Sequence, residues 1–381
     1  MNPLPRNARV LFAGGGTGGH LFPALALADR IRETLGDKAE IVFVGTKRGI
    51  EYRMRTKLGY PLELVNIRGL ARSFTVKNLI VPFLVAGSLL RARAILKKYR
   101  PDIVIGTGGY VSWPVLKAAA GRNITTVLQE QNSYPGVATR QLAGRAARIY
   151  LGFEEADRYL PQGAPVIVTG NPVRISVAGG DRVEAIRQFN LDPDKKTILV
   201  LGGSQGARSI NNAVLKDLKA DGLDKKYQLL WQTGEGDYKD VATELGDRVE
   251  HHSLFPFAHQ MDLVYAAADL AVTRAGAITL AELSACRVPS IVIPYPFAAG
   301  DHQRKNARAY VDRGYAEQID PDELENVSLL SRAVAMFESG RTEQMKQNLE
   351  RDLVGRKPAV DVIVEDILKL IARAQEATVE S

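Results

Sequence analysis

Three glycine-rich loops hold the residues of this 381-residue chain that are best suited to chemistry. The first loop runs from Gly14 to Gly19 and ends at His20, the second runs from Gly106 to Tyr110, and the third runs from Gly202 to Gly206. Backbone N–H groups in a glycine loop that opens a helix attract anions. The loops therefore predict a site for a phosphate-bearing ligand. His20 is a candidate general base, with a purely structural histidine as the alternative.

Two common phosphate motifs do not describe these loops. Gly14-x-Gly16-x-x-Gly19 matches the dinucleotide fingerprint, but the segment from Val44 to Arg48 lacks the acid that would bind a ribose hydroxyl. None of the loops ends in Gly-Lys-Ser or Gly-Lys-Thr, which excludes a P-loop nucleotide hydrolase.

Two later segments add groups that suit a nucleotide sugar. Arg274 to Glu282 follows an apolar run and opens a helix, so that Glu282 is a candidate for a ribose diol, with a solvated helix glutamate as the alternative. Asp301 to Ala307 combines neutral amides with cations, which suits a sugar next to a diphosphate.

Short apolar runs that alternate with helical patterns must position these residues. They predict strands at 10–13, 40–45, 102–106 and 125–128, and again at 196–201, 229–232, 270–273 and 290–294. This alternation, repeated in each half, is typical of an α/β protein with two parallel sheets. We expect a first domain at 1–173, a second at 174–357, and a final helix within 358–381 that packs back on the first.

Composition limits the function classes. Hydrophobic residues make up 45% and charged residues 24%, as in ordinary globular proteins. The single cysteine, Cys286, excludes an intrachain disulfide and a cysteine zinc cage, and the five histidines form no HExxH pattern, so we expect no metal. The net charge of +7 suits an anionic partner. Because no dense basic run interleaved with aromatic residues is present, we expect no nucleic acid.

No segment has the pattern of a membrane span or a signal peptide. The apolar run Val10 to Ala13 is too short for a signal peptide, and the stretch from Asn78 to Leu90 contains Pro82 and falls short of the about 20 residues a span needs. These features predict a cytoplasmic protein or one bound to a membrane face.

The motifs taken together resemble the bacterial MurG family, whose members are UDP-N-acetylglucosamine:undecaprenyl-diphospho-muramoylpentapeptide N-acetylglucosaminyltransferases. The resemblance rests on the glycine loops together with Gln129-Glu130-Gln131-Asn132, Gly170 to Arg174 and Asp301-His302-Gln303, in family order over nearly the whole chain. It implies a GT-B fold, in which two Rossmann-like domains face a cleft, and it requires neither a cofactor nor a metal.

The resemblance also implies roles for particular residues. The nucleotide would lie on Ala277, Ile278, Thr279, Leu280, Ala281 and Glu282, with Glu282 on the ribose and Ala258 in the region of the uracil. Arg174 and Ser204 would bind the diphosphate, and Asn132 and Gln303 the GlcNAc. Thr17, Gly18, Gly19 and Tyr110 would complete the substrate site from the first domain.

This chain departs from the family at Gln129, where many members have histidine. An amide is a poor proton acceptor near neutral pH, so His20 becomes the candidate base, with Glu130 behind it. The implied reaction is attack of the 4-hydroxyl of MurNAc in lipid I on the anomeric carbon of UDP-GlcNAc. Configuration is inverted, UDP leaves, and lipid II is formed for peptidoglycan synthesis.

An acceptor on an undecaprenyl lipid implies contact with an anionic membrane surface, on the cytoplasmic face of the plasma membrane. The segment from Arg68 to Lys98 combines apolar residues with cations that include Arg72, Lys77, Arg91 and Arg93, although a core helix with solvated ends is the alternative. Two other functions stay open at this point. One is another GT-B enzyme, such as a lipid glycosyltransferase or a UDP-GlcNAc 2-epimerase, and the other is a non-catalytic UDP-sugar-binding module.

Overall fold

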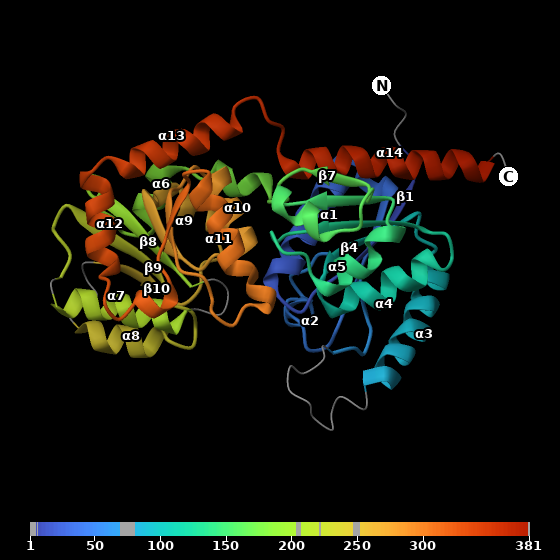
Figure 1. Ribbon diagram of the computed structural model, residues 1–381, viewed down its shortest axis with the longest axis horizontal. Helices are drawn as coiled ribbons and strands as arrows, with labels where there is room; N and C mark the ends of the chain where they lie inside the picture. Colours follow the sequence, from blue (N-terminus) through green and yellow to red (C-terminus); the bar gives the residue numbers. More distant parts are fainter. Residues whose placement is uncertain are drawn as a thin grey trace. The chain divides into compact units, whose positions relative to one another are not determined.

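The computed structural model describes residues 5, 7–68, 81–202, 207–220, 222–246 and 252–379 (Figure 1). The chain divides into two compact units, each with its own parallel sheet. The first unit comprises Met1–Pro172 and Lys357–Ser381, and the second comprises Val173–Arg356. The two-sheet α/β architecture predicted from the sequence is confirmed.

The first unit is built on a seven-stranded sheet in the order β3-β2-β1-β4-β5-β6-β7, in which all paired strands are parallel. The strands are β1 (Ala8–Gly14), β2 (Ala39–Gly45), β3 (Leu62–Leu64), β4 (Ile103–Gly108), β5 (Thr125–Glu130), β6 (Arg148–Leu151) and β7 (Val166–Val168). The strand order reverses between β1 and β4. In open parallel sheets, ligands bind outside the carboxyl ends of the strands at such a reversal. We call the side of a sheet formed by these strand ends its carboxyl edge.

The helices of the first unit are α1 (Gly18–Leu35), α2 (Ile50–Arg53), α3 (Val81–Tyr99), α4 (Gly109–Ala120), α5 (Val137–Leu142) and α14 (Ala359–Val379). The apolar periodicity of the sequence predicts a helix from Pro23 to Leu35, but helix α1 already begins at Gly18 and so contains this proline. The N–H groups of His20 and Leu21 both bond the carbonyl of Thr17, so the helix starts directly on the glycine loop. The missing N–H of Pro23 lies only in the second turn, where packing of the buried helix face outweighs its loss.

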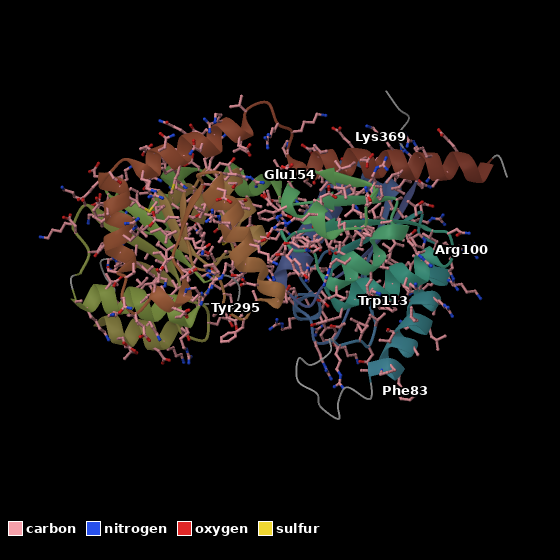
Figure 2. All side chains as sticks on the ribbon, viewed as in Figure 1. Phe83, Arg100, Trp113, Glu154, Tyr295 and Lys369 are labelled. Atoms are coloured by element: carbon pink, nitrogen blue, oxygen red, sulfur yellow. The ribbon has the colours of Figure 1, made fainter. Side chains whose placement is uncertain are left out.

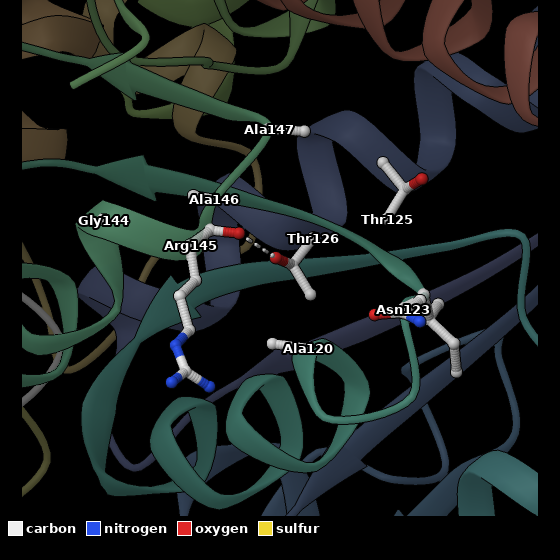
Figure 3. Close-up of a pocket in the computed structure, with 9 residues that line it drawn as sticks. Ala120, Asn123, Thr125, Thr126, Gly144, Arg145, Ala146 and Ala147 are labelled. Carbon is white, nitrogen blue, oxygen red and sulfur yellow. Dashed lines mark hydrogen bonds between the residues drawn. The ribbon is translucent and has the colours of Figure 1, made fainter. Parts of the chain in front are cut away.

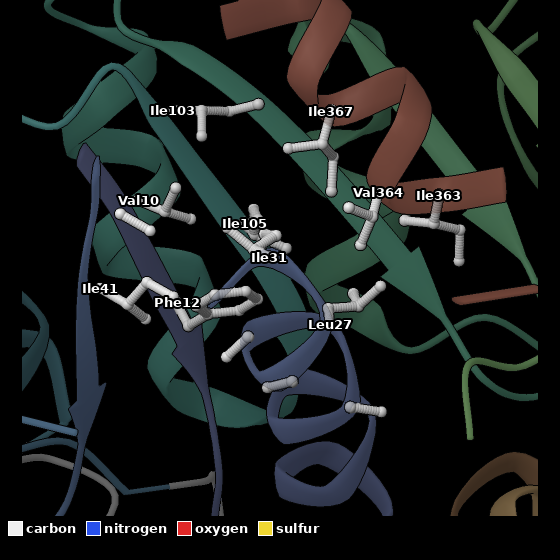
Figure 4. Close-up of a cluster of buried hydrophobic side chains, with 14 of the residues drawn as sticks. Val10, Phe12, Leu27, Ile31, Ile41, Ile103, Ile105, Ile363, Val364 and Ile367 are labelled. Carbon is white, nitrogen blue, oxygen red and sulfur yellow. The ribbon is translucent and has the colours of Figure 1, made fainter. Parts of the chain in front are cut away.

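Helix α14 completes the core of the first unit, although the whole second unit, Val173–Arg356, precedes it in the sequence. Figure 4 shows Ile363, Val364 and Ile367 of α14 pointing toward Leu27 and Ile31 of α1, and all five are fully or almost fully buried. Burial of each such side chain stabilises the fold by about 1.5–3 kcal/mol. Polar contacts fix the helix as well, since Arg30 donates to Asp361 at 2.6 Å and Tyr150 donates to Asp366 at 2.9 Å.

The second unit repeats the design with a six-stranded sheet in the order β10-β9-β8-β11-β12-β13. Its strands are β8 (Lys196–Leu201), β9 (Tyr227–Gln232), β10 (Ser253–Phe255), β11 (Leu270–Thr273), β12 (Ser290–Val292) and β13 (Ala316–Gln318). Its helices are α6 (Arg182–Gln188), α7 (Arg208–Ala220), α8 (Tyr238–Leu245), α9 (Met261–Ala267), α10 (Ala277–Ala285), α11 (His302–Asp312), α12 (Leu329–Glu338) and α13 (Arg341–Leu353). Here the strand order reverses between β8 and β11, so the loops after these two strands are the candidate ligand loops.

Candidate active site

His20 lies in the first turn of α1, at the carboxyl edge of the first sheet and next to its reversal of strand order. The half-buried ring places Nδ1 3.0 Å from Oε1 of Gln131, which follows β5. The hydroxyl of Thr107, near the end of β4, donates to the carbonyl of His20 at 2.8 Å. Loops after β1, β4 and β5, which are far apart in sequence, therefore meet at this histidine.

Gly108 is required for this approach. A Cβ atom at this position would lie 2.7 Å from Nδ1 of His20, and the backbone has φ near +100°, a conformation that side chains rarely adopt. The second glycine loop thus lets its backbone pack against the imidazole ring.

The first glycine loop is held by Glu51, a fully buried carboxylate in α2. One oxygen accepts the N–H of Gly16 at 2.8 Å, and the other accepts the N–H of Thr46 at 2.8 Å. A carboxylate of the protein itself therefore accepts a hydrogen bond from an N–H group for which the sequence pattern predicted a bound anion. The N–H group of Gly16 is therefore engaged within the protein, and an anion at this loop would have to bind its other N–H groups.

Glu130 ends β5, and its carboxylate is directed into its own loop. It accepts hydrogen bonds from the N–H groups of Asn132 at 3.1 Å and Gly136 at 2.9 Å, and from the hydroxyl of Thr139 at 2.6 Å. With both oxygens engaged and 3% of the residue exposed, these contacts favour a structural role for Glu130 over the catalytic role expected from the sequence. Glu130 shapes the loop that carries Asn132.

Gln129, where the chain departs from the family pattern, is buried rather than open to a substrate. Its amide nitrogen donates to Oδ1 of Asn171 at 3.1 Å, and Asn171 donates in turn to the carbonyl of Gln131 at 2.9 Å. Gln129 therefore links the loop after β5 to the segment that ends the first unit.

The remaining candidates of the first unit line the same edge with different exposure. Thr17 and Gly19 are exposed at the start of α1, while Gly18 is buried. Tyr110, near the start of α4, exposes 62% of its surface. Tyr110 thus presents an aromatic face to solvent on the edge that holds His20.

In the second unit, α10 begins after β11 without a side-chain cap at Gly276. The first N–H groups of a helix have no partner within it, so those of Ala277, Ile278 and Thr279 point outward at the positive end of the helix dipole. Leu280 and Ala281 continue this helix, and its first turn is suited to a negatively charged or hydrogen-bond-accepting ligand.

Glu282 follows in the same helix and accepts a hydrogen bond from the hydroxyl of Tyr265 at 2.7 Å. Burial raises the pKa of Glu282 above its ordinary value, while the Tyr265 bond and the charge of Arg174 lower it. Burial likewise raises the pKa of the neighbouring Cys286 thiol to about 12. Arg174 itself is exposed.

Arg274 comes directly after β11 and contributes a cation that is partly buried. It donates to the carbonyls of Ile293 at 3.3 Å and Pro294 at 3.2 Å, and to the hydroxyl of Ser209 at 2.6 Å. Burial lowers its pKa. No carboxylate pairs with Arg274 among the described residues, so an anionic ligand would supply the missing charge. The sequence pattern predicted a ligand site in this segment, but it could not show that Arg274 has no carboxylate partner among the described residues.

The side-chain amides of Gln303 and Gln232 fix two further segments at the second unit's edge. Gln303 accepts the N–H of Tyr295 at 2.9 Å through its oxygen, which directs its NH₂ group away from that contact. The N–H of Ala258 donates to the side-chain oxygen of Gln232 at 2.8 Å, which fixes the segment expected near the uracil. Ser204 lies outside the described residues.

A cavity of about 550 Å³ lies elsewhere in the first unit (Figure 3). It is lined by Ala120, Asn123, Ile124, Thr125, Thr126, Gly144, Arg145, Ala146 and Ala147. These residues surround the end of α4 and the amino ends of β5 and β6, opposite the carboxyl edge. No candidate residue lines this cavity.

Helix α3 carries the apolar residues that the sequence placed in a membrane-facing patch. Figure 2 shows Phe83 pointing away from the helix, and 78% of it is exposed. Arg91 and Lys98 both pair with Glu63, at 2.7 Å each, whereas Arg93 has no acidic partner among the described residues. Arg72 and Lys77 lie outside the described residues.

The described helices include none that is long and apolar enough to cross a membrane.

Comparison with known proteins agrees over both units. The glycosyltransferase family 28 N-terminal domain matches residues 10–151, and the glycosyltransferase family 28 C-terminal domain matches residues 197–361. A protein of Desulforamulus reducens, named UDP-N-acetylglucosamine--N-acetylmuramyl-(pentapeptide) pyrophosphoryl-undecaprenol N-acetylglucosamine transferase, is 38% identical over 96% of this chain and 100% of its own. A protein of the same name from Chlorobaculum tepidum is 41% identical over 95% and 99% of the two chains.

Solved structures agree in fold. The crystal structure of Acinetobacter baumannii MurG matches with a TM-score of 0.71 and 26% identity over 95% of this chain and 99% of the other. A UDP-GlcNAc 2-epimerase from Neisseria meningitidis matches with a TM-score of 0.61 but 15% identity, which shows the fold alone. With two parallel-sheet units of the GT-B type and full-length relatives of one name, the chain belongs to glycosyltransferase family 28 and, within it, to the MurG family of N-acetylglucosaminyltransferases.

Proposed function

We propose that this chain is an inverting N-acetylglucosaminyltransferase that moves GlcNAc from UDP-GlcNAc to the 4-hydroxyl of MurNAc in lipid I and so produces lipid II. The observation that carries the proposal is the 38–44% identity to transferases of that name over most of the chain. The arrangement of His20 and of the residues on the second unit's carboxyl edge supports it. The alternative of a 2-epimerase has only a likeness of fold in its favour.

His20 acts as the general base in this proposal. The acceptor's 4-hydroxyl forms a bond to the anomeric carbon while the bond from that carbon to the phosphate oxygen breaks, with its electrons leaving on UDP. The hydroxyl proton passes to the imidazole. A positioned base contributes about 10²- to 10⁴-fold to such a step. The amide contact at Nδ1 supports this role, because it leaves the other ring nitrogen for the substrate.

Thr17, Gly18, Gly19 and Tyr110 belong to the acceptor side of the reaction in this proposal, because they share the edge that holds His20. The buried carboxylate of Glu51 next to the first glycine loop disfavours a phosphate there and suits a neutral sugar. Glu130 contributes by holding the loop from which Asn132 reaches the GlcNAc.

The donor is held by the second unit in this proposal. The uncapped start of α10 and the cations Arg174 and Arg274 stabilise the charge that develops on the departing diphosphate, and preorganised groups of this kind act without a metal. Glu282 accepts hydrogen bonds from the ribose diol, Gln303 donates to the GlcNAc, and the segment around Ala258 lies at the uracil. Ser204 is proposed for the diphosphate from the sequence alone.

The acceptor's lipid implies a place at the cytoplasmic face of the plasma membrane. Exposed Phe83 and Leu90 on α3, together with Arg93, which has no acidic partner in the described part of the chain, support contact with an anionic lipid surface. Arg91 contributes less in this proposal, since Glu63 already neutralises it.

The experiment is a transfer assay with purified protein, lipid I and radiolabelled UDP-GlcNAc. We expect label in lipid II and one UDP released per sugar transferred, with neither formed when lipid I is omitted. Label recovered as N-acetylmannosamine would support the epimerase instead. Binding of UDP-GlcNAc without turnover on lipid I would indicate a binding module, and either result would overturn the proposal.

A further inference from the structure

The side chain that contacts the His20 ring is an amide, Gln131, and not an acid. In the part of the chain that the structure describes, Gln131 is the one side chain that hydrogen-bonds the ring, through its oxygen at 3.0 Å from Nδ1. The two buried acids of the neighbouring loops, Glu51 and Glu130, direct their oxygens to backbone N–H groups and the hydroxyl of Thr139. Thr107 and Gly108, which approach from β4, carry no charge.

The contacts of its nitrogen fix the orientation of the Gln131 amide. Nε2 donates to the carbonyl of Thr107 at 2.9 Å and to the carbonyl of Gln129 at 3.0 Å. Carbonyl oxygens only accept hydrogen bonds, so the NH₂ group must face them. Rotating the amide by half a turn would set its oxygen against these acceptors in a site where 2% of Gln131 is exposed. The amide oxygen therefore faces His20.

A closed set of amides holds this orientation. One hydrogen of the Gln131 NH₂ group is shared between the carbonyl and the side-chain oxygen of Gln129, whose nitrogen donates to Asn171, and Asn171 donates back to the carbonyl of Gln131. All three are buried. Because each amide has its oxygen and nitrogen ends assigned by its neighbours, none can flip alone without leaving buried polar groups unpaired.

An oxygen at Nδ1 decides which ring nitrogen carries the proton. The amide oxygen is an acceptor only, so Nδ1 must donate and carry hydrogen, and in the neutral ring Nε2 then holds the lone pair. We propose that Gln131 is a positioning residue of the transfer reaction, holding His20 in the Nδ1–H tautomer so that Nε2 receives the proton of the attacking hydroxyl. This inference rests on the proposed function, because that function makes His20 the base.

The inference explains Gln129 in physical terms. A residue at this position acts through Gln131 rather than on the substrate, since its amide oxygen accepts from Gln131 and its nitrogen is bound to Asn171. The site thus orients its histidine with neutral groups, whereas an aspartate would do so with a charge.

The test is to replace Gln131 with methionine, which keeps the length of the side chain but has no amide oxygen. Long-range ¹H–¹⁵N spectra of ¹⁵N-histidine-labelled protein report the tautomer of His20, and its signals are assigned by their loss in His20→Ala. We expect the Nδ1–H tautomer in the wild type and a mixture of both tautomers in Gln131→Met. The kcat for transfer to lipid I should fall by about 10- to 100-fold, as for other outer partners of a functional histidine, with little change in either KM.

The matched control is Gln228→Met in β9. Gln228 is also buried and also donates through its amide to a carbonyl and a hydroxyl, at 2.8 Å and 3.0 Å. Gln228→Met should lower the melting temperature about as much as Gln131→Met does, without any change in the His20 tautomer or in kcat. This comparison separates the loss of a buried amide from the loss of the His20 contact.

A second variant, Gln131→Glu, keeps an oxygen at Nδ1 and adds charge. It should retain the Nδ1–H tautomer and shift the acid limb of the kcat profile to higher pH, because a carboxylate stabilises the protonated ring. An Nε2–H tautomer in the wild type, or a tautomer that Gln131→Met does not change, would overturn the inference whatever the activity. A changed tautomer with unchanged kcat would instead overturn the base role of His20, and a wild type without transfer would overturn the proposed function itself.

Discussion

The two carboxyl edges of this protein share a topology and differ in charge. At the edge of the first unit, His20 lies among the neutral amides of Gln131 and its partners, and the carboxylate of Glu51 already occupies an N–H group of the glycine loop. At the edge of the second unit, α10 begins without a cap, and Arg274 lacks an acidic partner among the described residues. The carboxylate at the first edge is thus bonded to its own loop, whereas a cation at the second edge is left without a carboxylate partner in the part of the chain that the structure describes.

This difference shows how one architecture can serve two halves of a reaction. A parallel sheet provides a site at its reversal of strand order regardless of chemistry. The side chains on the neighbouring loops then decide the ligand. In the proposed reaction, the internal acid suits the first edge to a neutral hydroxyl and a proton transfer, and the cation Arg274 suits the second edge to a diphosphate.

The largest effect is expected from His20→Ala. It should lower kcat by about 10²- to 10⁴-fold, because the variant lacks the proposed acceptor of the hydroxyl proton. Donor affinity should change little, since the proposed uridine and ribose contacts lie in the second unit. Single-turnover transfer at saturating donor and lipid I, followed against pH, measures the effect.

Two further variants test the specificity of that result. Gln129→His should be tolerated, and it should not rescue His20→Ala, because position 129 is buried and faces Asn171 rather than the substrate. Near-normal turnover in His20→Ala would leave His20 as a structural residue of the turn and would remove the contrast between the two edges.

Arg274→Gln should weaken UDP binding by roughly 10- to 100-fold, as expected for the loss of charged hydrogen bonds to a diphosphate. The control is Arg308→Gln, which removes an exposed cation paired with Asp312 on α11 of the same unit and should have almost no effect. Titration calorimetry with UDP at several salt concentrations measures both. Equal losses for the two variants would indicate a general field effect and not a site at Arg274.

Glu282→Gln should raise the KM for UDP-GlcNAc more than it lowers kcat. The reason is that the lost contact with the ribose should weaken donor binding by about 1–3 kcal/mol. Burial raises the pKa of Glu282, so as pH falls its ionised form is lost earlier than that of an ordinary glutamate. The wild-type KM should therefore rise on acidification before the rest of the enzyme is affected, and the Glu282→Gln profile should be flat. An unchanged KM would remove Glu282 from the ribose.

The same raised pKa predicts that Glu282→Gln stabilises the fold although it weakens donor binding. A carboxyl group with a raised folded-state pKa contributes stability below its unfolded pKa and loses it as pH rises through the folded pKa. The ionised Glu282 thus costs stability at neutral pH. Glu282→Gln should melt at a higher temperature than the wild type while it binds donor less well, and a lower melting temperature would contradict the assigned cause of the shift.

The smallest effect is expected on helix α3, for which we propose contact with the membrane. Arg93→Gln should weaken binding to anionic phospholipid vesicles by roughly fivefold, since each cation near such a surface contributes about 1 kcal/mol. Arg91→Gln should have less effect, because Glu63 already pairs with Arg91. Vesicle co-sedimentation at low and high salt measures both. Equal losses for the two arginines, or no dependence on salt, would contradict the proposed patch.

The sequence by itself determined the α/β class, the two sheets and most of their strands. Parallel strands buried on both faces are short apolar runs, and these are visible at Val10 to Ala13 and at Ile198 to Leu201 without any knowledge of contacts. The glycine loops and His20 were found in the same way, because their chemistry is local. The start of α1 was misplaced, since Pro23 argues against a helix that tertiary packing nevertheless extends to Gly18.

Only the tertiary structure decided how the candidate residues work. Gln131 is separated from His20 by 111 positions, and Tyr265 from Glu282 by 17, so no spacing in the chain predicts either hydrogen bond. The sequence makes Glu130 a candidate base, and only the structure shows that its oxygens contact its own loop. Likewise, only the structure places the carboxylate of Glu51 against the first glycine loop. The physical reason is that a side chain's role depends on its partners and its burial, which arise when strand ends distant in sequence meet at one edge of a sheet.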